Sequence, residues 1–276
     1  MPAAAPYKAK SVQAGALKLS YLDYGTRGKP TMLCIHGSAA NAHWFDFTAP
    51  GFTDEYHVLA LDLRGHGDSD HVSPPQYTYE DYAADVNKVV EQLDLRDFVL
   101  IGHSMGGMVS LVYTAGYPGR VGKLVVVDTG RRLSAERVEK MRVFGARPPS
   151  SYATRDELIA RYKLEPSGTQ MAAPEVLRHM AENSARENAD GTWGHKFDRR
   201  FYATFERRDS FLLWDKVKVP ALLVKGGLSK RINDEMYAQV LKLAPQVKLA
   251  EVPDADHHVT LDNPKVFVDE VKAFLS

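Results

Sequence analysis

The sequence lacks an excess of charge, a long apolar run and a second cysteine. Its 276 residues carry 35 Lys and Arg against 35 Asp and Glu, so no overall field attracts nucleic acid or an anionic membrane. No run of about 18 apolar residues occurs, and no signal-peptide pattern opens the chain. Cys34 is the only cysteine, which excludes an internal disulfide and fits a reducing compartment. These absences predict a cytoplasmic protein that acts on a small molecule, without nucleic acid or membrane partners.

Familiar cofactor motifs are also missing. There is no phosphate-binding P-loop, dinucleotide fingerprint or zinc-ligand spacing; residues 65–67 (Gly-His-Gly) lack the third glycine of the dinucleotide motif. We therefore expect no cofactor and no metal. The length suits one large α/β domain or a domain that carries an insertion, and the oligomeric state stays open.

Short apolar runs bounded by Gly, Asp and Pro are typical of strands buried on both faces, as in a parallel sheet. Residues 12–24 alternate around Gly15, as an antiparallel edge hairpin would. Helical stretches separate the runs, so the pattern predicts an α/β fold with a doubly wound, mostly parallel, eight-stranded sheet. The expected runs are 32–35, 58–61, 98–101, 124–127, 221–224 and 247–252, and the expected helices are 79–93, 105–115, 234–243 and 264–275.

The alternation breaks between residues 131 and 214, where we expect no strand. Residues 135–144, 155–162, 174–186 and 198–205 favour helices instead. We interpret this segment as a helical cap inserted after the sixth strand, with the core domain formed by residues 1–130 and 215–276. If the segment were only extra packing, no pocket would lie beneath it.

A nucleophile motif follows one of the expected strands. Residues 102–106 read Gly-His-Ser-Met-Gly, between the run 98–101 and a helical stretch. In that context Gly-x-Ser-x-Gly places serine on a tight strand-to-helix turn, with glycines where side chains would collide. Ser104 could instead cap the helix, a position that serine favours, but a cap requires neither glycine. The motif therefore predicts Ser104 as the nucleophile.

Four motifs in this order resemble the α/β-hydrolase family. Besides residues 102–106, residues 36–38 (His-Gly-Ser) resemble its oxyanion loop, residues 63–69 its RGxGxS segment, and residues 256–264 its histidine loop and the start of its last helix. The similarity runs from about residue 20 to the C-terminus and is weakest across the expected cap. Family members with serine in this turn include esterases and lactonases, whereas epoxide hydrolases and dehalogenases use aspartate there.

A serine hydroxyl needs an adjacent imidazole to take its proton. The resemblance implies His257 as this base, because its spacing to Leu261 and Pro264 matches the family loop. The neighbouring His258 is the alternative, and we expect it to be a neighbour or a pocket-wall residue. For the oxyanion hole, the family geometry implies the backbone N–H groups of Met105 and Ser38.

The acid departs from the usual family pattern. It generally follows the strand that corresponds to 221–224, but residues 225–232 contain no carboxylate. Asp128 directly follows the run 124–127, where some members place the acid, and it keeps the required order of serine, acid and histidine. We therefore predict Asp128, with a turn residue at the cap entry as the alternative. Asp234 comes late for the usual loop and is expected to start or cap a helix.

The prediction is a serine hydrolase that cleaves a carboxylic ester or lactone through an acyl-enzyme. Carbon–carbon bond hydrolases, perhydrolases and cofactor-free dioxygenases also use a serine in this turn, and a ligand receptor with little turnover is the alternative outside enzymes. The presence of an intact serine, histidine and acid argues against a receptor, because a protein that only binds a ligand needs none of them.

The cap's arginines, among them Arg131, Arg132, Arg207 and Arg208, could meet an acidic substrate but are more typical of a solvated face. Its aromatic residues could form pocket walls or ordinary core: Trp193, Phe197, Phe201, Tyr202, Phe205, Phe211 and Trp214.

Overall fold

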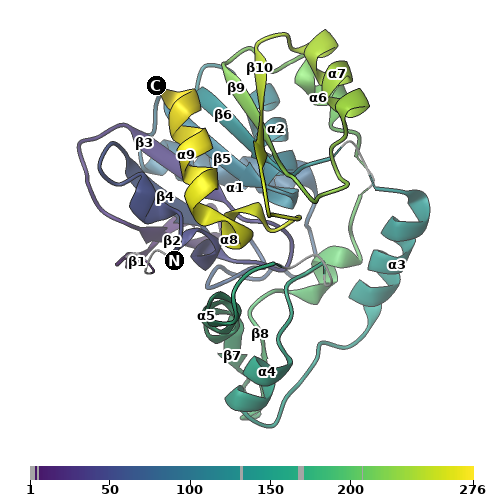
Figure 1. Ribbon diagram of the computed structural model, residues 1–276. Helices are drawn as coiled ribbons and strands as arrows, with labels where there is room; N and C mark the ends of the chain where they lie inside the picture. Colours follow the sequence, from purple (N-terminus) through teal and green to yellow (C-terminus); the bar gives the residue numbers. More distant parts are fainter. Residues whose placement is uncertain (1–3, 5, 131–132, 167–170, 207) are drawn as a thin grey trace.

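One large sheet organises the molecule (Figure 1). The computed structural model describes residue 4 and residues 6–130, 133–166, 171–206 and 208–276. The eight strands of the sheet are β1 (Lys8–Ala14), β2 (Leu17–Asp23), β3 (Thr31–Ile35), β4 (His57–Leu61), β5 (Phe98–His103), β6 (Val121–Val127), β9 (Ala221–Gly226) and β10 (Val247–Val252). Their order is β1-β2-β4-β3-β5-β6-β9-β10. The pairs β1/β2 and β2/β4 are antiparallel and all others are parallel.

The strands form because alternate side chains are buried on opposite faces of the sheet. In β3, Leu33 packs into the apolar cluster on one face, while Met32 and Cys34 pack into the cluster on the other. The expected edge hairpin is present, with Gly15 in its turn at φ +66°. The predicted doubly wound, mostly parallel, eight-stranded sheet is confirmed.

Helices cover both faces of this sheet. One face carries α1 (Tyr79–Gln92), α2 (Met105–Gly116), α6 (Phe211–Trp214) and α7 (Asp234–Leu243). The other carries the 3-10 turns η1 (Ala42–Phe45) and η2 (Ala49–Gly51) with α8 (Val259–Asp262) and α9 (Pro264–Leu275). Among the described residues, no helix is both long and apolar enough to cross a membrane.

The segment between β6 and β9 leaves the sheet and projects from the core in Figure 1. We call its described residues 133–166 and 171–206 the insert. Its elements are α3 (Ala135–Ala146), α4 (Arg155–Arg161), α5 (Pro174–Ser184), β7 (Ala185–Glu187), β8 (Trp193–His195) and the 3-10 turn η3 (Arg199–Tyr202). Residue 131, the expected start of the cap, lies outside the described residues, and the division into core and cap remains a prediction.

The expectation that this segment contains no strand is wrong. Strands β7 and β8 pair as a short antiparallel hairpin. Its turn closes where Asn188 N–H donates to the Thr192 carbonyl (2.7 Å), with Gly191 at φ +79°. The expected helix over 174–186 therefore ends at Ser184, and the one over 198–205 is only the 3-10 turn η3. The Asp-Gly pair at 190–191 was the available turn signal, but strands of three residues leave no readable alternation.

Buried charges fix the loops that follow β3 and β4. Asp62 is 3% exposed and accepts hydrogen bonds from the backbone N–H groups of Ala42 (2.7 Å) and Asp68 (2.9 Å). Arg64 pairs with Asp85 of α1, where its Nη2 lies 2.7 Å from Asp85 Oδ1. These contacts tie both loops to each other and to α1, and so hold the edge of the sheet where β3, β4 and β5 end.

We expect Arg64→Met to lower the free energy of unfolding by about 3–5 kcal/mol, because Asp85 would remain as a buried charge without its partner. Replacing both residues, as Arg64→Met with Asp85→Leu, should recover most of the loss since no unpaired charge is left. Urea unfolding followed by circular dichroism measures both. Arg96→Met is the control: Arg96 and Asp94 are about three-quarters exposed, and an exposed pair contributes about 1 kcal/mol at most. An Arg64→Met variant as stable as wild type would contradict this account.

Candidate active site

Ser104 lies on a strained turn between β5 and α2. Its backbone has φ 53° and ψ −113°, a region that non-glycine residues rarely adopt. The turn fits only because the residues two positions before and after Ser104 are glycines: a Cβ on Gly106 would lie 2.4 Å from the carbonyl oxygens of Ile35 and His36. Ser104 N–H donates to the Val127 carbonyl at 2.9 Å. The close packing of β3, β5 and β6 therefore holds the serine in place.

The structure brings together Ser104, His257 and Asp128. His257 Nε2 lies 3.0 Å from Ser104 Oγ, and His257 Nδ1 lies 2.7 Å from Asp128 Oδ2. The three residues follow β5, β10 and β6, whose carboxyl ends meet at one edge of the sheet. The imidazole and the carboxylate are buried, at 1% and 0% exposure. A proton can therefore pass between serine and imidazole while the carboxylate holds the other ring nitrogen.

Asp128 is held by groups from the loop after β9. Ser229 Oγ donates to Asp128 Oδ2 at 2.8 Å, and Arg231 Nε lies 3.8 Å from the same oxygen. The loop that lacks a carboxylate thus supplies a hydroxyl and a guanidinium to the acid, two partners that sequence reasoning missed. Asp234 begins α7 and its side chain is 98% exposed, with Lys225 Nζ 3.9 Å away. It does not approach His257.

His103, which the sequence reasoning also missed, positions His257 through the backbone. The Nε2–H of His103 donates to the His257 carbonyl at 2.7 Å, and the ring of Trp44 stacks on the ring of His103. The only sequence signal was its place beside Ser104 in the turn. His258 instead directs Nε2 to the Pro166 carbonyl, 3.3 Å away. Of the two adjacent histidines, only His257 is hydrogen-bonded to Ser104.

Burial sets the charge states of the buried pair. It raises the pKa of the Asp128 carboxyl, and it lowers the pKa of His257 well below its usual range. Nearby positive charges, including those of Arg231 and Arg137, lower the pKa of His257 further. The imidazole is therefore neutral at pH 7 and able to accept a proton, but the surroundings resist the imidazolium that would result.

The two residues expected to form the oxyanion hole lie beside the serine. Ser38 and Met105 both line the cavity that contains Ser104, and Met105 is the first residue of α2. Within the described part of the chain, neither backbone N–H donates a hydrogen bond. Free donors next to a nucleophile are what a developing oxyanion requires.

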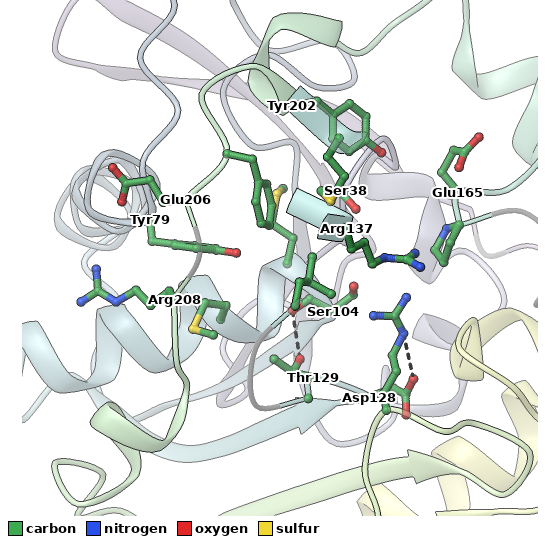
Figure 2. Close-up of a pocket in the computed structure, with 18 of the residues that line it drawn as sticks. Ser38, Tyr79, Ser104, Asp128, Thr129, Arg137, Glu165, Tyr202, Glu206 and Arg208 are labelled. Carbon is green, nitrogen blue, oxygen red and sulfur yellow. Dashed lines mark hydrogen bonds and ion pairs between the residues drawn. The ribbon is translucent and has the colours of Figure 1, made fainter. Parts of the chain in front are cut away.

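A cavity of about 650 Å³ lies over Ser104, between the core and the insert (Figure 2). The core supplies Ser104, Met105 and Met108, and the insert supplies Tyr202 and Phe205. The insert therefore contributes walls to this cavity. Of the other aromatic residues singled out by sequence, Phe201 and Trp214 belong to the apolar core. Phe197 lines a neighbouring cavity of about 530 Å³.

Among the described residues, one cluster has the residue types of a metal site: His43, Asp46 and His179. Nδ1 of His43 and Nε2 of His179 lie 2.9 and 2.6 Å from Asp46 Oδ2, and the Tyr24 hydroxyl donates to Oδ1 at 2.6 Å. Hydrogen bonds therefore satisfy this carboxylate without an ion. The cluster joins α5 of the insert to η1, and none of its residues lines the cavity around Ser104.

Comparisons with known proteins agree with the fold. A family model described as the alpha/beta hydrolase fold matches residues 30–264. A serine hydrolase-like protein of Danio rerio is 32% identical over 273 residues, which cover 91% of this chain and 82% of that protein. The sn-1-specific diacylglycerol lipase ABHD11 of Mus musculus is 30% identical over 275 residues, which cover 94% and 86%.

A solved structure resembles this chain over nearly its full length. The crystal structure of E-2-(acetamidomethylene)succinate hydrolase superposes with a TM-score of 0.83, covering 98% of this chain and 99% of that one at 24% identity. At that identity the likeness shows the shared fold alone.

The geometry predicts a strongly hydrogen-bonded proton on Nδ1 of His257, because its carboxylate partner is close and both groups are buried. Such a proton resonates far downfield of the amide protons in a ¹H NMR spectrum. We expect Asp128→Asn to abolish or shift this resonance, and the matched exposed variant Asp234→Asn to leave it unchanged. A resonance that survives Asp128→Asn unshifted would mean that His257 has another partner.

Proposed function

The chain belongs to the α/β-hydrolase family, and on this premise we propose that it is a serine hydrolase that cleaves a carboxylic ester or lactone of a small molecule. Its relatives support a hydrolase in the coarse sense. The Danio rerio protein is named serine hydrolase-like, and the Mus musculus protein is named a diacylglycerol lipase. The second name supports an ester as the substrate of this chain too.

One observation carries the proposal: the continuous hydrogen-bonded chain from Ser104 Oγ through His257 to Asp128. Neutral His257 takes the proton of Ser104 as its oxygen attacks the carbonyl carbon. The N–H groups of Met105 and Ser38 donate hydrogen bonds to the negatively charged oxygen of the tetrahedral intermediate. His257 then returns the proton to the leaving alkoxide, which leaves an acyl-enzyme. Water attacks this ester with His257 again as base, which releases the acid and restores the serine.

Asp128 acts through the imidazole. By accepting the Nδ1–H it fixes the tautomer whose Nε2 lone pair faces Ser104, and it stabilises the imidazolium that forms. Ser229 and Arg231 position its carboxylate in turn. We include the insert in the proposal as a cap, residues 131–214, that closes the cavity over the serine and gives the substrate its apolar walls.

The other candidates with a serine nucleophile differ in substrate rather than in the residues of the site. A panel of acyl esters, lactones and a meta-cleavage product separates an esterase or lactonase from a carbon–carbon bond hydrolase. Fluorophosphonate labelling separates all of these from a receptor, since only an activated serine reacts. No feature of the described residues favours one of the alternatives over ester cleavage.

We expect Ser104→Ala to lower kcat for hydrolysis of a short 4-nitrophenyl ester by about ten-thousandfold, because no group replaces the attacking oxygen. Labelling by a fluorophosphonate probe should disappear in the same variant. Circular dichroism verifies that the fold is kept. Hydrolysis within tenfold of wild type by a folded variant would rule out Ser104 as nucleophile.

We expect His257→Ala and His258→Ala to differ by orders of magnitude in kcat on one ester. The base and the nucleophile act as a unit, so the loss of His257 should approach that of Ser104→Ala. His258 is buried and its loss should act mainly on thermal stability. If His257→Ala and His258→Ala lowered kcat equally and only modestly, His257 would not be the base.

We also expect Asp128→Asn to lose far more activity than Asp234→Asn.

A further inference from the structure

Positive charge is concentrated in the part of the chain that covers the site. The whole protein is neutral, yet residues 131–214 contain 16 Lys and Arg against 12 Asp and Glu. Arg131, Arg132 and Arg207 lie outside the described residues. In the cavity around Ser104 the described cations are Arg137, Lys140, Arg208, Lys230 and Arg231, and the carboxylates are Asp128, Glu165 and Glu206.

Two of these cations already have partners away from the serine. Arg208 pairs with Glu80, and Lys140 Nζ lies 2.6 Å from Glu136 on its own helix. Figure 2 places Arg208 together with Glu206 on one side of Ser104 and Arg137 on the other. Charge on the Arg208 side is therefore balanced within the protein.

The opposite side of the cavity has two guanidinium groups. Arg231 comes from the loop after β9, lies 3.8 Å from Asp128 Oδ2, and keeps a quarter of its side chain exposed. Arg137 comes from α3 of the insert, and among the described residues no carboxylate lies within ion-pair distance of its guanidinium. The Glu165 side chain points away from Arg137 in Figure 2. Two like charges thus face one cavity. Asp128, the carboxylate within ion-pair distance of Arg231, is already hydrogen-bonded to His257 and Ser229.

We propose that the substrate carries a carboxylate besides its scissile acyl group, and that Arg137 and Arg231 bind this carboxylate. The proposal rests on the serine-hydrolase function proposed above and deepens it by naming the substrate class. A guanidinium offers paired N–H donors that match the two oxygens of a carboxylate. Arg231 comes from the core and Arg137 from the insert, so a bound carboxylate would link the core to the insert.

The electrostatics of the reaction give this carboxylate a second effect. Burial lowers the pKa of Arg231, and the charge of Arg137 lowers it further. Both also oppose the positive charge that His257 must take up during attack. A substrate carboxylate between them would offset that opposition. Arg137 is exposed and Arg231 keeps a quarter of its side chain exposed, so water screens part of this effect.

Phenylboronic acids test the proposal without knowledge of the natural substrate. Boron accepts the serine oxygen and becomes a tetrahedral anion that resembles the acyl-transfer intermediate. The 3-carboxy and 3-carbamoyl compounds have nearly the same shape and differ in charge, and the 4-substituted pair places the same groups farther from boron. Inhibition constants are measured against a neutral 4-nitrophenyl ester.

In at least one pair, we expect the carboxylate to bind the wild-type enzyme about tenfold or more tightly than the carboxamide. This ratio should fall to within about threefold in Arg137→Gln, because one of the two guanidinium donors is lost. Arg231→Lys keeps the charge beside Asp128 but loses the paired donors, so it should also lower the ratio. Arg142→Gln is the matched control: Arg142 lies on the same helix and does not line the cavity, so the ratio should stay at the wild-type value.

The outcomes separate this proposal from the one on which it rests. If the charged and neutral boronic acids inhibit the wild-type enzyme equally, Ser104 chemistry stands and the carboxylate site is overturned. The carboxylate site is also overturned if Arg137→Gln and Arg142→Gln lower the inhibition ratio equally. The preference for the charged inhibitor would then come from long-range electrostatics rather than from contact with Arg137. If no boronic acid inhibits and no fluorophosphonate labels the protein, the serine-hydrolase function itself fails.

Discussion

The site depends on the backbone conformation of Ser104. A positive φ at a residue with a side chain costs free energy, on the order of 1–3 kcal/mol. The contacts around Ser104 hold its backbone in this conformation. Gly102 and Gly106 let α2 approach β3 and β5, since a Cβ at either position would overlap backbone atoms. The Ser104 N–H is fixed to β6, and Thr129 Oγ1 donates to the Ser104 carbonyl at 2.9 Å. The backbone of Ser104 is thus fixed by the packing of the sheet rather than by its own side-chain contacts.

The same packing explains why the acid can follow β6 instead of β9. These two strands are neighbours in the sheet, so their carboxyl ends lie side by side. Asp128 itself has a positive φ of 44°, and its N–H donates to the Val224 carbonyl of β9 at 2.8 Å. From this position its carboxylate reaches His257, and the β9 loop sends Ser229 and Arg231 to it. A carboxylate that follows β6 thus lies beside the loop that follows β9.

Burial acts on the pKa values of both Asp128 and His257. A carboxylate and an imidazole removed from water interact strongly, yet each resists taking up charge. The arginine beside Asp128 favours the ionised acid but disfavours the imidazolium next to it. Arg137 and Arg231 both lower the pKa of His257, and the charge of a substrate placed near them can change that balance.

The sequence by itself determined the α/β sheet, its strand-to-helix order and the identities of Ser104, His257 and Asp128 as candidates. It could do so because buried parallel strands and the glycine-bounded turn depend on local patterns of residues. It could not determine the β7–β8 hairpin, whose strands are too short to show a period. Nor could it reveal that His103, Ser229 and Arg231 support the site, or that Arg137 of α3 faces the same cavity as Arg231. Only the tertiary structure decided these contacts, because they join segments about 100 or more residues apart whose meeting depends on how the whole sheet and the insert pack.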